Sequence, residues 1–155
     1  MRQLPQIQDF LRTPEERFQN LPDFPYEPHY TLIGGLRVAH IDEGPRDGPV
    51  VLLMHGEPAW SFLYRKMIPV LVNAGYRVVV PDQVGFGRSD KPKKEAFHQV
   101  HTHAQILCEL CDRLGLTQVQ LVGPTDIQPL LQALVAMQPE RYRLQAVQNP
   151  PPLPD

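Results

Sequence analysis

The architecture of the chain follows from residues 50–58, Val50-Val51-Leu52-Leu53-Met54-His55-Gly56-Glu57-Pro58. The first five residues are apolar without alternation, which predicts a strand covered on both faces of a sheet. The chain then turns at Gly56, and an apolar pattern at helical spacing begins only beyond Pro58. In parallel α/β sheets, active sites lie at such turns beyond the carboxyl ends of strands. A glycine there leaves backbone N–H groups open to hold a developing negative charge, so we expect a functional site at this turn.

Outward from this turn, the sequence predicts an α/β fold that starts with an antiparallel hairpin. Gly34-Gly35 separates two apolar or alternating runs, 30–33 and 36–42, which is a hairpin signal. Gly75 and Gly115 follow two helical patterns as C-terminal stops. The later strands are expected at 50–54, 76–80, 119–122 and 144–147, and the helices at 61–74, 102–114 and 130–137. Strands that alternate with helices predict a doubly wound, mostly parallel sheet.

Length and composition are those of one globular domain without a strongly charged partner. A chain of 155 residues can bury a single core of ordinary size. Its formal net charge of −2 gives no electrostatic case for nucleic acid or an anionic membrane. No apolar run approaches the roughly 20 residues that span a bilayer, and the first residues lack a signal pattern, so we expect a cytoplasmic location. The two cysteines are then expected to be reduced thiols.

Both ends of the chain are expected to lie outside the packed core. Residues 11–18, Leu-Arg-Thr-Pro-Glu-Glu-Arg-Phe, predict a short helix with Thr13 as N-cap and Pro14 at its first position. The prolines at 22, 25 and 28 predict an extended segment after it, because each disfavours helix for the preceding residue. We therefore divide the chain into an N-terminal arm at 1–30, a core at 31–149 and a Pro-rich tail at 150–155.

Several runs together resemble one known family. His-Gly-Glu-Pro-Ala-Trp-Ser-Phe-Leu-Tyr-Arg at 55–65 resembles the oxyanion loop of α/β-hydrolases and, more narrowly, that of haloalkane dehalogenases. The run at 11–18 is similar to the N-terminal arm of the same family. Pro-Asp-Gln-Val-Gly-Phe-Gly-Arg-Ser-Asp-Lys-Pro at 81–92 is similar to the α/β-hydrolase loop after the fourth strand, whose implied role is structural, so that Asp82 has no catalytic part. The sequence thus resembles a haloalkane dehalogenase, and the core at 31–149 would be a partial α/β-hydrolase core.

This resemblance implies a hydrolase that cleaves a carbon–halogen bond through an aspartyl ester, with a small haloalkane and water as reactants and no cofactor. The nucleophile of the family follows the strand expected at 119–122. An ungapped match puts Thr125 at that position, and a shift of one residue puts Asp126 there, so both are candidates. In either register the glycines that follow the nucleophile in the family are replaced. The residues alone also allow Asp126 to be the N-cap of the helix that follows.

The resemblance also implies which groups hold the developing charge. The backbone N–H of Glu57 and that of the residue after the nucleophile would form the oxyanion and halide hole, with Trp60 close to it. His55 and Gly56 belong to the same oxyanion loop. A haloalkane dehalogenase would thus use Glu57, Trp60, Gly56 and His55 for oxyanion and halide binding.

The resemblance covers the N-terminal half of the family fold, so it implies a chain truncated before the helical cap. The second acid and the histidine that activates the hydrolytic water would then be missing, and the activity would be impaired or absent, with one turnover at most. One alternative is a non-catalytic truncated relative or interaction module, which predicts exposed apolar sheet edges and self-association. Another is an epoxide hydrolase, which shares His-Gly-x-Pro and an aspartate nucleophile.

A cluster of histidines and cysteines offers a further alternative. His98, His101, His103, Cys108 and Cys111 lie within fourteen residues and have side chains suited to zinc. A zinc-binding protein is therefore a third alternative. Cysteines three residues apart on the predicted helix 102–114 also fill the edge of a core. We favour this packing interpretation and assign no metal ligands.

Overall fold

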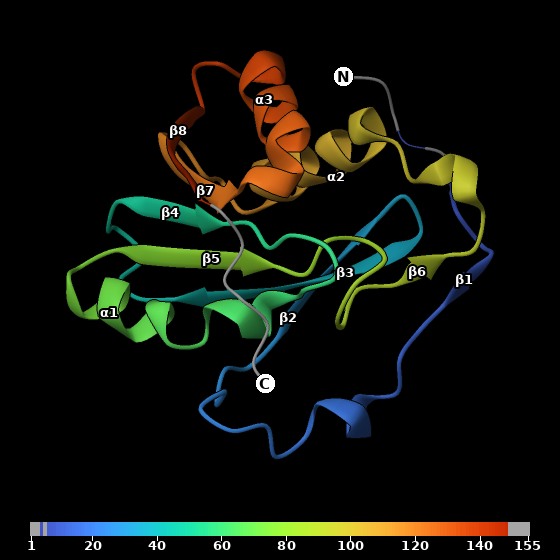
Figure 1. The fold of residues 1–155 in the computed structure, drawn as a ribbon, viewed down its shortest axis with the longest axis horizontal. Coiled ribbons are helices and arrows are strands. Elements are labelled where there is room, and N and C mark those ends of the chain that lie inside the picture. The colour runs from blue at the N-terminus through green and yellow to red at the C-terminus, as the bar shows by residue number, and fades with distance from the viewer. Residues whose placement is uncertain (1–3, 5, 149–155) are drawn as a thin grey trace.

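The computed structural model describes residue 4 and residues 6–148, and at its centre lies a six-stranded sheet in the order β2-β3-β5-β4-β7-β8 (Figure 1). The strands of this sheet are β2 His29–Ile33, β3 Leu36–Glu43, β5 Arg77–Pro81, β4 Val50–Leu53, β7 Val119–Pro124 and β8 Tyr142–Gln148. β2 and β3 form the predicted hairpin, β3 pairs antiparallel with β5, and the remaining pairs are parallel. The predicted α/β sheet with an antiparallel start is confirmed.

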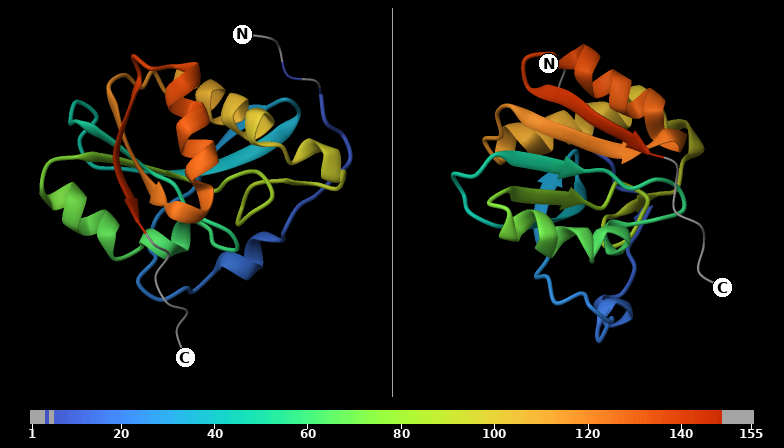
Figure 2. Two further views of the ribbon diagram at one scale, coloured as in Figure 1. Left: turned by 45° about the horizontal axis from the view of Figure 1, so that its top comes forward. Right: turned by 60° about the vertical axis from the view of Figure 1, so that its left-hand side comes forward.

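Helices cover both faces of this sheet (Figure 2). α2 Val100–Arg113 and α3 Gln128–Met137 lie on one face, and α1 Met67–Asn73 lies on the other. Alternate residues of the region around β4 enter different cores. Leu52 and Met54 belong to the cluster under α2 and α3, whereas Val51 and Leu53 belong to the cluster under α1. The uninterrupted apolar run at 50–54 is thus explained by burial on both faces.

Two glycines end helices as predicted. Gly75 has φ +96° and Gly115 has φ +67°, conformations that L side chains rarely adopt. After α1, the Tyr76 N–H donates to the carbonyl of Leu71 at 3.1 Å, and after α2 the Leu116 N–H donates to the carbonyl of Cys111 at 3.0 Å. These bonds satisfy carbonyls that the helix leaves open, which is the Schellman arrangement.

The continuous helix predicted at 61–74 is wrong. The segment is divided into a 3-10 turn, η2 Ser61–Tyr64, and the helix α1 that starts at Met67. Pro69 lies in the first turn of α1. Because proline lacks an N–H and clashes with the carbonyl four residues earlier, it is tolerated only in a first turn. A helix running through Pro69 from Ser61 would therefore have been broken.

The N-terminal arm also differs from the prediction. Phe10–Leu11 forms strand β1, which pairs with β6 Lys91–Pro92, and only Glu15–Phe18 is helical, as the 3-10 turn η1. Pro14 rather than Thr13 occupies the N-cap position, and no side chain caps the turn. The guanidinium of Arg12 donates two hydrogen bonds to the buried Asp90, at 2.6 and 2.8 Å, and so holds the preceding residues extended.

Two outer strands leave apolar side chains exposed. Leu32 on β2 is 63% exposed and Leu144 on β8 is 38% exposed. The interaction-module alternative, with self-association through exposed sheet edges, stays a prediction. The Pro-rich tail at 150–155 lies outside the described residues. No helix in the described part of the chain is long and apolar enough to cross a bilayer.

Candidate active site

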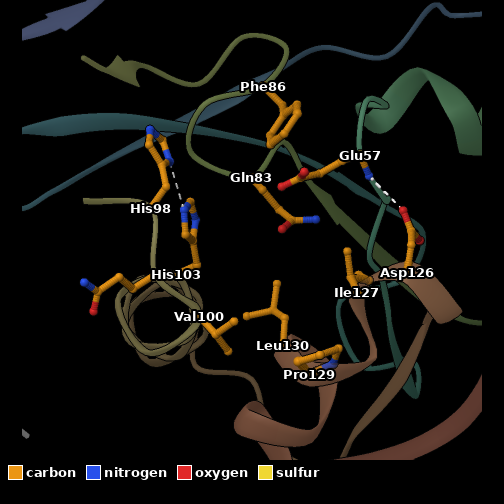
Figure 3. Close-up of a pocket in the computed structure, with 11 residues that line it drawn as sticks. Glu57, Gln83, Phe86, His98, Val100, His103, Asp126, Ile127, Pro129 and Leu130 are labelled. Atoms are coloured by element: carbon orange, nitrogen blue, oxygen red, sulfur yellow. Dashed lines mark hydrogen bonds between the residues drawn. The ribbon is translucent and has the colours of Figure 1, made fainter. Parts of the chain in front are cut away.

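The carboxylate of Asp126 meets the oxyanion loop at the carboxyl ends of two neighbouring strands. β4 and β7 are parallel partners, so the turns that follow them lie side by side. The backbone N–H of Glu57, after β4, donates to Oδ2 of Asp126, after β7, at 3.2 Å (Figure 3). A backbone donor on a carboxylate oxygen is one half of the arrangement that stabilises negative charge in oxyanion holes.

Gly56 makes this approach sterically feasible. A Cβ atom built at Gly56 would lie 2.6 Å from both carboxylate oxygens of Asp126. Real Cβ atoms essentially never come that close, so any side chain at position 56 would displace the carboxylate. The glycine in the oxyanion loop therefore leaves room for the carboxylate of Asp126, which lies 70 residues further along the chain.

The turn that carries Asp126 is a relaxed 3-10 turn. η4 Thr125–Ile127 connects β7 directly to α3, and the N–H of Gln128 donates to the carbonyl of Thr125. Within the described part of the chain, the non-glycine residues with positive φ are Asn20, Asp23 and Gln118, so the turn has no left-handed residue. Because no residue of the turn has a positive φ, the backbone does not require glycine, and Ile127 and Gln128 can occupy these positions.

The interpretation of Asp126 as an N-cap is wrong. The N-cap of α3 is Ile127, and no side chain caps the helix. The carboxylate of Asp126 instead points to the Glu57 amide, and the residue is exposed. Thr125 is also exposed and precedes Asp126 at the start of the turn. Asp126 thus brings a carboxylate to the oxyanion loop.

The buried side chain of His55 connects the oxyanion loop to the loop after β5 by hydrogen bonds. Its side chain is fully buried, Nε2 accepts a hydrogen bond from the N–H of Gln83 at 3.0 Å, and Nδ1 lies 3.0 Å from the carbonyl of Gly56. Since Nε2 accepts, Nδ1 carries the proton and donates. Burial lowers the pKa of His55, which keeps the ring neutral. With both nitrogens engaged, His55 positions the loop and has no free nitrogen for a ligand.

A pocket opens beside Asp126. Its volume is about 390 Å³, and it lies among the loops after β4 and β5 and the first turns of α2 and α3. In Figure 3, Asp126 and Glu57 lie on one side, His98 and His103 lie on the opposite side, and Leu130 and Pro129 lie below. The lining residues are Glu57, Gln83, Phe86, His98, Gln99, Val100, His103, Asp126, Ile127, Pro129 and Leu130. A pocket of this size with a largely apolar floor suits a small organic molecule.

Trp60 is not among the residues that line this pocket, and its predicted place beside a halide site stays a prediction. Its ring stacks on Phe62 at 5.6 Å between centroids and contacts the arm residues Phe18 and Phe24 at 5.3 and 5.4 Å. Phe18 and Phe24 of the N-terminal arm thus form an aromatic cluster with Trp60 and Phe62. Trp60 thus pins the N-terminal arm.

Asp82 organises the loop at 81–92, in agreement with its implied structural role. One carboxylate oxygen accepts from the N–H of Ser61 at 2.7 Å, and the other accepts from the N–H of Arg88 at 3.0 Å. A Cβ at Gly87, whose φ is +54°, would lie 2.5 Å from this carboxylate. The loop is therefore wrapped around Asp82, and it brings Phe86 to the pocket.

The five-residue zinc constellation does not assemble. Cys108 and Cys111 are buried in the core face of α2, where the hydroxyl of Tyr142 lies 3.6 Å from Sγ of Cys108. Burial raises the pKa of Cys111 to about 11, so the thiol stays protonated. Among residues 4 and 6–148, no group of three or more histidine, cysteine or acidic side chains is placed to hold a metal ion.

His98 and His103 were missed as pocket residues by the sequence analysis. They line the wall that faces Asp126 and hydrogen-bond to each other, with Nδ1 of His98 3.2 Å from Nε2 of His103. Burial, with the nearby His98, lowers the pKa of His103 to about 4. His98 follows the turn η3 Glu95–Phe97 and His103 lies in the first turn of α2, and no local pattern reveals that these two positions face Asp126.

The comparisons with known proteins agree with this geometry. A family model described as "alpha/beta hydrolase fold" matches residues 49–123, which include β4, the oxyanion loop, β5, α2 and most of β7. The chain therefore has the α/β-hydrolase fold. The haloalkane dehalogenase of Psychrobacter cryohalolentis is 44% identical over 90% of this chain and 48% of that protein. The haloalkane dehalogenase of Mycobacterium marinum is 47% identical over 73% of this chain and 40% of that protein.

Solved structures of haloalkane dehalogenases and epoxide hydrolases superpose on this chain. Haloalkane dehalogenase DpaA from Paraglaciecola agarilytica, described as tetrameric, superposes with a TM-score of 0.82 at 44% identity, over 88% of this chain and 47% of that one. Epoxide hydrolase A from Mycobacterium thermoresistibile superposes with a TM-score of 0.69 at 28% identity, over 76% of this chain and 37% of that one. The chain spans about half the length of the curated relatives that it matches.

Proposed function

We propose that this chain carries the nucleophile and the oxyanion loop of a haloalkane dehalogenase-like hydrolase, with Asp126 as the nucleophile. The observation that carries the proposal is the hydrogen bond from the Glu57 N–H to Oδ2 of Asp126 at the mouth of a pocket. The relatives at 44–47% identity that are named as haloalkane dehalogenases support the choice of reaction. The substrate class is a small haloalkane.

The first chemical step is a displacement at carbon. One carboxylate oxygen of Asp126 attacks the carbon that bears the halogen, the carbon–halogen bond breaks, and the halide leaves with the electron pair. Because Oδ2 is held by the Glu57 amide, Oδ1 is the oxygen left to attack. Oδ2 then becomes the carbonyl oxygen of the ester, and the same amide is in place when negative charge develops there.

Hydrolysis of the ester needs water and a base. Water attacks the ester carbonyl, the alcohol leaves, and the carboxylate returns with release of one proton. Within residues 6–148, no imidazole hydrogen-bonds to Asp126. His55 has both ring nitrogens engaged elsewhere. We therefore expect this chain by itself to release about one equivalent of halide and to remain as the ester.

The experiment is halide release from a short bromoalkane, measured as moles of bromide per mole of folded chain. Wild type is expected to release about one equivalent, and Asp126→Ala is expected to release none. Asp47→Ala is the matched control, because Asp47 is an exposed carboxylate outside the pocket. Thr125→Val tests the other register, and loss of release in that variant with retention in Asp126→Ala would overturn the assignment.

The neighbouring alternatives give different results in the same assay. An epoxide hydrolase would form an adduct with a small epoxide and release no bromide; the lower identity and TM-score of the epoxide hydrolase structures favour the dehalogenase. A non-catalytic relative would form neither adduct. No bromide from a chain whose circular dichroism shows it folded would therefore contradict the proposed reaction.

A further inference from the structure

The two histidines of the pocket wall form a close imidazole pair. Nδ1 of His98 lies 3.2 Å from Nε2 of His103, and the two rings stack with centroids 5.3 Å apart at 23° (Figure 3). His98 follows the 3-10 turn η3 Glu95–Phe97, and His103 lies in the first turn of α2. His98 is exposed, so the pair is open to solvent and to the pocket.

Three neighbours fix the orientation of His98. Its Nε2 lies 3.1 Å from the carbonyl of Pro92, which can only accept, so Nε2 carries the proton and the neutral ring presents its Nδ1 lone pair to His103. A Cβ at Gly85 would lie 3.3 Å from Cε1 of His98, so the glycine allows the ring to pack against the loop. The ring of Phe97 lies edge-on to both imidazoles, with centroid distances of 5.4 Å to His98 and 5.8 Å to His103.

This arrangement has the two features of a pair of metal ligands. In metal sites, a ligating imidazole commonly donates its other N–H to a backbone carbonyl, as His98 does to Pro92. Two nitrogens that each bind one ion at 2.0–2.1 Å with near-tetrahedral angles lie roughly 3.3 Å apart. The separation of 3.2 Å between the ring nitrogens of His98 and His103 matches this spacing.

We propose that His98 and His103 together bind one divalent transition-metal ion, of the zinc or copper type, at the wall of the pocket. The ion replaces the proton that the two nitrogens share, and this proton moves to Nδ1 of His103 or to solvent. In the described residues no third histidine, cysteine or carboxylate completes the set. Water or a pocket ligand fills the other positions, so the site is open.

This site differs from the zinc constellation considered in the sequence. Cys108 and Cys111 point into the core, and His101 is exposed without joining the pair. The proposed His98–His103 site also departs from the sequence-based prediction that the chain has no metal ligands. The proposal is independent of the dehalogenase reaction, because it rests on the imidazole pair alone.

The test is titration of the tag-free chain with Cu²⁺ and with Zn²⁺ by isothermal calorimetry. We expect one site, with the affinity reduced at least tenfold in His98→Ala and in His103→Ala. His101→Ala is the matched control, because it removes an exposed histidine between the two and should leave the affinity unchanged. Circular dichroism reports whether each variant is folded, and the exposed His98 keeps the test valid if His103→Ala does not fold.

Electron paramagnetic resonance of the Cu²⁺ complex gives a second readout that a purely structural role would not produce. Two equatorial imidazole nitrogens are expected in wild type and one in His98→Ala. Binding that is unchanged in His98→Ala, or a spectrum with one imidazole nitrogen in wild type, would overturn the proposal. Failure of halide release would leave this result untouched.

Discussion

Replacing Gly56 by alanine should disable Asp126 with little effect on the rest of the fold. The new Cβ would lie 2.6 Å from both carboxylate oxygens, and contacts under 3.0 Å essentially never occur. The carboxylate must therefore retreat by about 0.4 Å or rotate away. Because the Glu57 N···Oδ2 distance is already 3.2 Å, such a retreat takes it beyond hydrogen-bond length.

The expected effect on chemistry follows from this displacement. A misplacement of about 1 Å can cost roughly 100-fold in rate, so a shift of about 0.4 Å with loss of the orienting bond should slow alkylation of Asp126 at least about 10-fold. Gly56 is not among the glycines with positive φ, so alanine adds no backbone strain there. The fall in rate should thus exceed what a small loss of stability explains.

The assay is the rate at which a bromoalkane adds its alkyl group to the chain, followed by intact mass. Gly115→Ala is the contrasting control: its φ is +67° and no atom lies within 4 Å of the added Cβ, so it should lower stability by about 1 kcal/mol and leave alkylation unchanged. Alkylation of Gly56→Ala at the wild-type rate would refute the steric argument, as would equal slowing in both variants.

Three other predictions concern stability. Burial lowers the pKa of His40 from 6.5 to about 4, so below pH 6.5 the unfolded chain takes up a proton that the folded chain excludes. The free energy of unfolding should therefore fall by about 3 kcal/mol as the pH drops from 6.5 to 4. Urea titrations of His40→Gln should show a smaller fall. Arg12→Ala should lower the free energy of unfolding by about 1–2 kcal/mol, after allowance for solvent screening of Arg12, because it leaves the buried Asp90 without its guanidinium; an unchanged urea midpoint would contradict this. His55→Phe should cost about 1–3 kcal/mol, because the phenyl ring cannot accept the buried amide bond, and a melting temperature equal to wild type would exclude the loop-holding role.

The parts of the fold that the sequence predicted are those set by local burial and backbone chemistry. The run at 50–54 is uninterrupted because both faces of its strand are covered, and Gly75 and Gly115 end helices because only glycine readily adopts their positive φ. The oxyanion loop could be placed for the same reason, since Gly56 lies three residues beyond the end of the buried strand β4. These features depend on residues close together in the sequence.

The parts that it did not predict depend on contacts between distant segments. Arg12 reaches the distant Asp90 next to Thr13, which caps no helix, and Trp60 packs against Phe18 and Phe24 of the arm. The break before α1 is the exception, since Pro69 is visible in the sequence and its effect on the helix could have been recognised.

The candidate site shows the same division. Asp126 and Thr125 could not be ranked from the sequence, because the ranking depends on which side chain meets the Glu57 amide across two strands. Ile127 and Gln128 stand where the resemblance implies glycines, and the 3-10 turn at 125–127, which the pattern did not reveal, accommodates them. The opposite pocket wall, His98 with His103, depends on contacts of His98 with Gly85 and with the carbonyl of Pro92, which lie in other segments of the chain.

The role of Asp126 is decided by the position of the alkyl group after reaction with a bromoalkane, read by peptide mass spectrometry with fragmentation. An ester on Asp126 is expected, at about one equivalent per folded chain and absent from Asp126→Ala. Glu57 is the built-in comparison, because its carboxylate lines the same pocket. An alkyl group on Glu57 or Thr125 with none on Asp126, or no alkyl group on a folded chain, would contradict the central role of Asp126.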